Sequence, residues 1–225
     1  MKKIVPFIFI CMLCLSCGPA NKITRESQYA AMYENMPRTL LVMPPINRTT
    51  NVEAKDLLYT SVSTPLIESG YYVISPHLAM DILKAESAYD AELFIEQPLT
   101  QFKEYFGADA VVFSQIDTWT KRGLGIDTKI RYIIKSTTTN EVLFDRSCDL
   151  YLSFYQNNGS NNLLGMVVNL AAAAIETAAS DHIEAARLAN YYIFSDIPRG
   201  VYSPDHMQDK EVIAQAKDIK ATVRQ

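Results

Sequence analysis

Histidine and cysteine, the residues that most often bind metals or act as nucleophiles, are scarce in this chain of 225 residues, which has three histidines and four cysteines. No histidine has a second histidine, a cysteine or a carboxylate at a recognised ligand spacing, such as HExxH or paired CxxC. The GxSxG elbow, the Walker A loop and the GxGxxG fingerprint are also missing. The sequence therefore predicts no catalytic residue, no metal site and no cofactor, and we expect His77, His182 and His206 to be structural or on the surface.

The chain also lacks an apolar run long enough to cross a bilayer as a helix, which takes about 20 residues. Two shorter runs, residues 4–15 and 163–175, come closest. Together with residues 176–189, the second run predicts a long helix, or two in sequence, packed on a sheet. The alternative is a helix that binds a partner or forms a homo-oligomer, because its small residues permit close approach of another backbone.

The first apolar run belongs to a targeting segment. Two lysines precede it, and Ser16 stands directly before Cys17. This pattern resembles a bacterial lipoprotein signal, in which residues 1–16 are removed and Cys17 carries lipid. Cys14 and Leu15 depart from the residues usual at their positions. An ordinary cleaved secretion signal and an uncleaved anchor are the alternatives.

The cysteine count bears on disulfides. With a lipid on Cys17 and the preceding residues removed, Cys148 is the one remaining thiol, so no internal disulfide can form. Cys148 falls on the apolar positions of a period-two pattern that runs from Phe144 to Phe154. We interpret it as a small buried core residue rather than a nucleophile or a ligand.

Composition and charge favour a folded, mildly acidic domain. Hydrophobic residues make up 48% of the chain and charged residues 20%, so a core can form. Roughly 200 mature residues suit a single domain. The formal net charge of −4 becomes more negative when the two lysines of the signal are removed. This charge argues against nucleic acid as a partner and against electrostatic adhesion to anionic lipid.

Periodicity predicts an α/β domain over residues 39–202, after a polar tether over 17–38 that contains a short helix near 29–35. The order of elements favours a mixed sheet of about five strands packed with helices. We expect strands at 39–43, 71–75, 110–120, 126–135 and 142–154, and helices at 56–69, 77–85 and 98–106 as well as the long one above. Pro65 predicts a kink or an early break in its helix. Residues 203–225 are expected to form an irregular or partly disordered tail, with helical composition but little apolar face over 210–223.

One loop is a candidate binding site. Asn47, Arg48, Thr49 and Thr50 follow the first buried strand, and open α/β sheets place ligand contacts at the carboxyl ends of their strands. These side chains supply donors suited to an anion or to the backbone of a partner. A plain connecting loop is the alternative.

Three segments resemble a family of bacterial outer-membrane lipoproteins that includes a meningococcal surface antigen. They are LLVMPPINRTTNVEAKDLLYTSVSTPLIESGYYVIS at 40–75, ADAVVFSQI at 108–116 and DIPRGVY at 196–202. The resemblance covers roughly residues 38–202. It implies a domain similar to the amino-terminal domain of periplasmic TolB. More distant relatives are the periplasmic domains of the curli-secretion pore lipoprotein and of a lipoprotein activator of peptidoglycan synthases.

The resemblance also carries an expectation about function. It implies a lipid-anchored, non-enzymatic protein of the outer membrane, facing the periplasm, that is an accessory or scaffold in an envelope secretion or transport complex. The implied partners are envelope proteins, among them a curli-pore-like lipoprotein. Beside the loop at 47–50, Pro198, Arg199 and Gly200 are candidate contact residues. A periplasmic lipoprotein that binds a small ligand or glycan, and an unrecognised hydrolase, are the alternatives.

Overall fold

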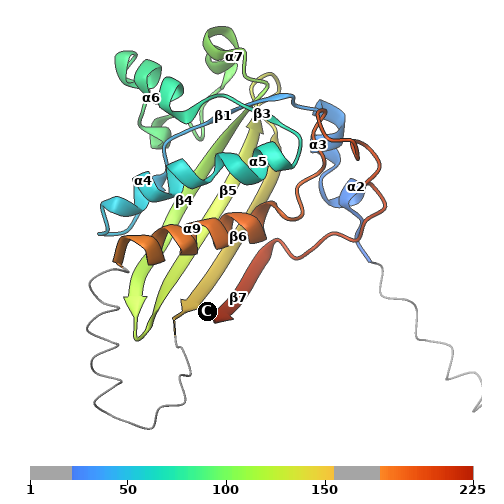
Figure 1. Cartoon of the computed structure of the whole chain (residues 1–225). Coiled ribbons are helices and arrows are strands. Elements are labelled where there is room, and N and C mark those ends of the chain that lie inside the picture. Colours follow the sequence, from blue (N-terminus) through green and yellow to red (C-terminus); the bar gives the residue numbers. More distant parts are fainter. Residues whose placement is uncertain (1–21, 155–177, 225) are drawn as a thin grey trace, which may run out of the picture.

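A computed structural model describes residues 22–154 and 178–224 (Figure 1). One mixed sheet has the strand order β3-β1-β4-β5-β6-β7, and β2 pairs with β4 beside this path. The strands are β1 (Thr39–Val42), β2 (Ile46–Asn47), β3 (Tyr72–Val73), β4 (Ala110–Arg122), β5 (Gly125–Ser136), β6 (Val142–Ser153) and β7 (Asp218–Arg224). The helices are α2 (Arg25–Gln28), α3 (Ala30–Asn35), α4 (Glu53–Ser61), α5 (Ser63–Glu68), α6 (Pro76–Ala85), α7 (Thr100–Phe106) and α9 (Ala178–Phe194), with a 3-10 turn, η2 (Ala91–Leu93).

The sheet combines parallel and antiparallel pairs. β1 runs parallel to β3 and β4, and β2 is also parallel to β4. β4, β5 and β6 form an antiparallel meander, and β7 returns parallel to β6. The predicted α/β class, a mixed sheet packed with helices, is confirmed. The sheet has seven strands rather than about five, because β2 and β7 were not foreseen.

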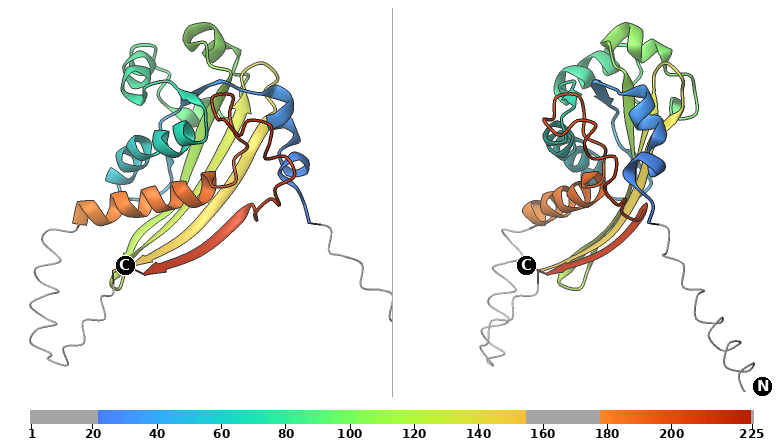
Figure 2. Two further views of the ribbon diagram at one scale, coloured as in Figure 1. Left: turned by 45° about the vertical axis from the view of Figure 1, so that its right-hand side comes forward. Right: turned by 90° about the vertical axis from the view of Figure 1, so that its right-hand side faces the viewer.

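Helices cover both faces of the sheet around β1. Leu40 and Val42 belong to the cluster that also contains residues of α4, α5 and α9, whereas Leu41 and Met43 belong to the cluster with residues of α6 and α7. The predicted strand at 39–43 is present as β1, and its residues are buried on both faces of the sheet. Figure 2 shows α4 and α9 together on one side of the curved sheet.

The helix predicted at 56–69 is broken, as Pro65 indicated. α4 ends at Ser61, and α5 contains Pro65 near its beginning, where a missing N–H costs no helical hydrogen bond. α9 provides the second half of the predicted long helix, and residues 163–175 lie outside the described residues. Within residues 22–154 and 178–224, no helix is long and apolar enough to cross a membrane.

Residues 22–38, the described part of the chain before β1, belong to the fold. The expected short helix is present as α3. The described part of the predicted tether packs on the sheet and is not a free linker. Tyr29 and Met32 are each 2% exposed, and Tyr29 stacks on Phe144 of β6 with 5.3 Å between ring centroids. From α2 onward, the predicted tether is therefore a covering element of the domain.

The prediction of frayed, helical residues at 210–223 is wrong. Residues 218–224 form β7, whose side chains alternate between half-buried and exposed along its whole length. Ile219, Ala221 and Val223 pack against the core, while the residues between them are exposed. This period-two pattern covers only seven residues and has only three apolar positions. The helical composition of the longer segment 210–223 was therefore misleading.

Removal of residues 218–225 should destabilise the protein, because it uncovers the edge of β6 and the core residues beneath Ile219 and Val223. We expect the free energy of unfolding in urea to fall by about 2 kcal/mol. The control is Lys220→Ala, an exposed change within β7 that should shift it by less than about 0.5 kcal/mol. An unchanged unfolding midpoint for the truncated chain would show that β7 does not pair with β6.

Candidate functional site

The loop after β2 is organised by its own polar side chains. The Asn47 Oδ1 accepts hydrogen bonds from the backbone N–H and the hydroxyl of Thr49, at 3.0 and 2.8 Å. The Asn47 amide donates to the Asn51 carbonyl at 2.7 Å, and Asn51 Oδ1 accepts from the N–H of Ala54 at 3.0 Å. Two of the four predicted contact residues thus shape the loop, while Asn51 caps the first turn of α4.

The other two predicted residues of this loop are accessible. Arg48 forms an ion pair with Asp117 at 3.2 Å, but its side chain is 56% exposed, and such a pair contributes little to stability. Thr50 is exposed as well. Beside them, Val52 is 83% exposed. Sequence reasoning missed Val52, which gives this surface an apolar member, and we call Arg48, Thr50 and Val52 the loop surface.

The second predicted contact segment packs against the end of α5. The N–H of Gly200 donates to the Ser69 carbonyl at 2.8 Å, and the N–H of Tyr202 donates to the Gly70 carbonyl at 3.0 Å. A Cβ at position 200 would lie 2.3 Å from the Gly70 carbonyl oxygen, so only glycine fits there. Gly200 therefore permits close approach of two backbones.

Pro198 is likewise buried, and its carbonyl accepts a hydrogen bond of 2.6 Å from the Tyr71 hydroxyl. Of the three predicted contact residues in this segment, only Arg199 is partly exposed. The IPRG sequence at 197–200 is thus a packing motif with one accessible side chain. The burial of Pro198 and Gly200 argues against direct contact of either residue with a partner.

The structure does not bring the two predicted contact segments together. The loop surface leads into the beginning of α4, whereas Gly200 bonds to the residue that directly follows α5. In Figures 1 and 2, the two segments lie at opposite ends of the α4–α5 layer. They form two separate surfaces.

A buried charge cluster ties the amino-terminal segment to the chain after α9. The Arg25 Nε donates to Asp196 at 2.9 Å and its Nη1 to Asp209 at 3.1 Å. Its second Nη donates to the Ser195 carbonyl at 3.0 Å. Asp196, which is fully buried, also accepts hydrogen bonds from the Tyr29 hydroxyl at 3.0 Å and from a backbone N–H at 2.9 Å. The hydrogen bonds to both carboxylates offset the cost of removing these charges from water.

Arg146 belongs to the same region and is 1% exposed. Its guanidinium donates to the carbonyls of Tyr192 and Ile193 in the last turn of α9, and to the Ala216 carbonyl at 3.0 Å. Burial lowers the pKa of Arg146. A cation at this end of a helix satisfies free carbonyls and is favoured by the helix dipole. Sequence reasoning missed both arginines, although Arg146 stands at an apolar position of its strand.

The histidines and the cysteine behave largely as predicted. His77 is exposed in the first turn of α6, and His182 is buried, stacked on Trp119 with 5.8 Å between ring centroids. Cys148 is fully buried, and this burial raises the pKa of its thiol to about 12. The described parts of the chain contain no group of three or more His, Cys, Asp or Glu side chains suited to a metal ion.

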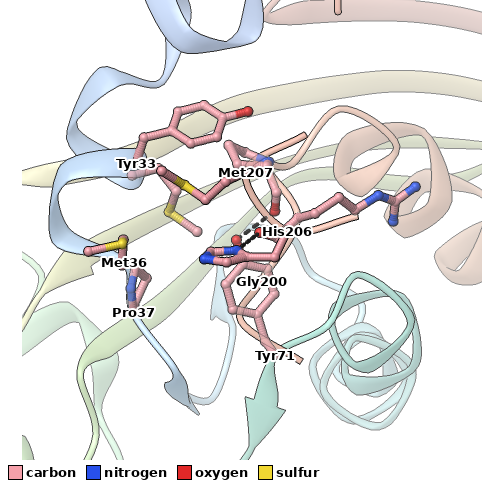
Figure 3. Close-up of a pocket in the computed structure, with 10 residues that line it drawn as sticks. Tyr33, Met36, Pro37, Tyr71, Gly200, His206 and Met207 are labelled. Carbon is pink, nitrogen blue, oxygen red and sulfur yellow. Dashed lines mark hydrogen bonds between the residues drawn. The ribbon is translucent and has the colours of Figure 1, made fainter. Parts of the chain in front are cut away.

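A hollow lies beside the packed 197–200 segment (Figure 3). Its walls come from α3 with the two residues that follow it, from the start of the β3 segment and from the chain after α9. They include Tyr33, Tyr71 and Arg199 together with three methionines and His206. The His206 Nδ1 lies 2.8 Å from the Arg199 carbonyl oxygen.

Residues 27–201 match the model of a protein family described as "Putative lipoprotein GNA1162-like". In sequence, the chain is 23% identical over 190 residues to the "Putative lipoprotein NMB1124/NMB1162" of Neisseria meningitidis serogroup B, covering 82% of this chain and 86% of that protein. The crystal structure of lipoprotein GNA1162 from Neisseria meningitidis is 22% identical and covers 62% of this chain and 98% of its own, with a TM-score of 0.47. The hypothetical protein CT253 from Chlamydia trachomatis is 16% identical and covers 71% and 93%, with a TM-score of 0.41.

Asp196→Asn should strongly destabilise the fold, because it leaves the buried guanidinium of Arg25 without its better partner. We expect the free energy of unfolding to fall by about 3 kcal/mol in urea melts. The matched control is Glu26→Gln, which removes the exposed ion pair with Lys210 at 2.8 Å and should cost less than about 1 kcal/mol. Equal effects of the two substitutions would contradict the central role of Asp196.

Proposed function

Because this chain belongs to the GNA1162-like family of lipoproteins, we propose that it is a lipid-anchored protein of the outer membrane whose domain faces the periplasm. There it acts as a non-enzymatic accessory or scaffold component of an envelope secretion or transport complex. Support for the anchor comes from the family and from the targeting segment that ends at Cys17.

The observation that carries this proposal is the short distance in the sequence between Cys17 and the first residues that are held in the fold. Thr24 caps α2 through its side chain, and the next residue, Arg25, is held in the buried charge cluster. The seven-residue step from Cys17 to Thr24 can span at most about 25 Å when fully extended. A lipid on Cys17 would therefore hold the domain directly beside the membrane, where it meets other envelope proteins.

Two separated surfaces suit a component that joins other proteins. At one end, the loop surface offers a cation, a hydroxyl and an apolar side chain in one short segment. At the other end, Arg199 is the accessible residue of the packed segment. Envelope proteins, among them a curli-pore-like lipoprotein or a second copy of this chain, are the proposed partners. Arginine is enriched at protein interfaces, and Arg48 is more exposed than Arg199, so the loop surface is the stronger candidate.

Cys17→Ser should release the protein from membranes while leaving the fold intact, since Cys17 lies outside the domain. The measurement is the fraction that sediments with outer membranes after a high-salt wash, together with the circular dichroism of the released protein. The control is Cys14→Ser, which should remain with the membranes, because Cys14 lies before the predicted cleavage site. A Cys17→Ser protein that still sediments would rule out Cys17 as the anchor.

Arg48→Glu should weaken partner capture. Pull-down from detergent-solubilised envelopes should recover a stoichiometric partner with the native chain and at least about fivefold less with this variant. Lys220→Glu, which makes the same charge change on the exposed face of β7, should capture the partner normally. Reproducible absence of any partner would contradict the scaffold role. Equal capture by both variants would show that the partner does not contact the loop surface.

A further inference from the structure

We propose that the hollow beside residues 197–200 binds Cu(I) through the thioether sulfurs of Met32, Met36 and Met207 and the Nε2 atom of His206. This inference concerns a different surface from the loop and does not rest on the lipid anchor. Thioether sulfur is a soft ligand, and soft ligands select Cu(I) over the hard cations.

The methionines are concentrated at this place. The chain has eight methionines, and three of them line this hollow. Met32 forms its buried base at 2% exposure, while Met36 and Met207 are 48% and 36% exposed. They come from distant parts of the chain, so the fold itself brings them together. Met36 and Met207 belong to none of the hydrophobic core clusters, and metal coordination gives these side chains a use.

The backbone at the two rim methionines supports this interpretation. Met36 and Met207 have φ values of 42° and 63°, in the left-handed region that residues other than glycine, asparagine and aspartate rarely adopt. Met36 is the C-cap residue directly after α3, in the left-handed conformation for which glycine or asparagine is the common choice. Such conformations are concentrated at functional sites, because the backbone there serves to place a side chain.

His206 is oriented as a metal ligand would be. Its Nδ1 lies 2.8 Å from the Arg199 carbonyl oxygen, which can only accept, so the ring proton resides on Nδ1. In the neutral imidazole, the Nε2 atom then carries the free lone pair. Metal-binding histidines usually hold their other nitrogen in this way, through a carbonyl or a carboxylate. Figure 3 shows the imidazole at the hollow with the side chains of Met36 and Met207 beside it.

The remaining lining residues favour a soft, singly charged ion. They include neither a carboxylate nor a thiol, so Ca²⁺ and Mg²⁺ lack their oxygen ligands and Zn²⁺ lacks thiolate. Arg199 is among the lining residues, and its positive charge disfavours a divalent ion more than a monovalent one. Three thioethers and one imidazole match Cu(I) best among these ions.

The test is a titration of Cu(I) without oxygen, in competition with a chromogenic Cu(I) chelator. It uses the full-length chain in detergent with Cys11, Cys14 and Cys17 replaced by Ser, so that no thiol of the targeting segment competes. We expect one Cu(I) per chain, and at least about tenfold weaker binding in each of Met36→Leu, Met207→Leu and His206→Gln. Met80→Leu, at a methionine of α6 outside the hollow, should bind as the parent chain does.

A second measurement on the unsubstituted hollow keeps the test independent of variant folding. Methionine methyl NMR with Ag(I), a redox-inert substitute for Cu(I), should shift the signals of Met32, Met36 and Met207 and leave those of Met43 and Met80 in place. The proposal is overturned if no Cu(I) binds in competition. It is also overturned if the Met36→Leu/Met207→Leu double variant binds as the parent does, or if Ag(I) leaves the three methyl signals unmoved.

Discussion

The ion pair between Arg25 and Asp196 is the contact on which the arrangement of the short helices before β1 and of the segment after α9 depends. It joins α2, the first helix of the described residues, to the second residue after α9, across a separation of 171 positions in the sequence. Asp209 adds a second carboxylate to the same guanidinium, and Arg146 adds a second cation at the end of α9. The positive charges of two arginines and the negative charges of two aspartates thus balance one another in a region from which water is largely excluded. Such a cluster tolerates the loss of one member poorly, because the remaining charge stays buried.

The sheet sets where everything else can lie. Burial of β1 on both faces requires a layer of helices on each side, and this divides the core into the two clusters of alternating residues. The layer with α4 and α9 is bounded by the loop surface at the start of α4 and by the packed segment 197–200 at the end of α5. The separation of the two candidate contact surfaces is therefore a consequence of the helix layer, and a partner at one surface leaves the other free.

Local signals in the sequence predicted the elements whose cause is local. The strand at 39–43, the break at Pro65 and the period-two strand at 142–154 each depend on neighbouring residues, and each is confirmed. The buried charge cluster depends on contacts between segments that are far apart in the sequence, so no local pattern could predict it. Arg146 stood out only as a charge at an apolar strand position. The hollow was missed for the same reason, since Met36 and Met207 become neighbours only through the fold. A single methionine in a sequence is usually interpreted as a core residue.

The charge cluster and the hollow are mechanically linked, which connects the two proposals. Asp209 bonds to Arg25 and also accepts from the N–H of Arg199 at 3.0 Å, so it fixes the loop that carries His206 and Met207. α3, which carries Met32 and leads into Met36, follows directly after α2 with its Arg25. The guanidinium of Arg25 thus helps to hold the walls of the hollow in place, through Asp209 on one side and through α2 on the other. A metal ion bound there would join those walls and so strengthen the attachment of the amino-terminal helices, because a ligand that binds only the folded arrangement stabilises that arrangement. On the proposal that lipid on Cys17 holds the domain beside the membrane, such an ion would act on the segment that connects the domain to its anchor.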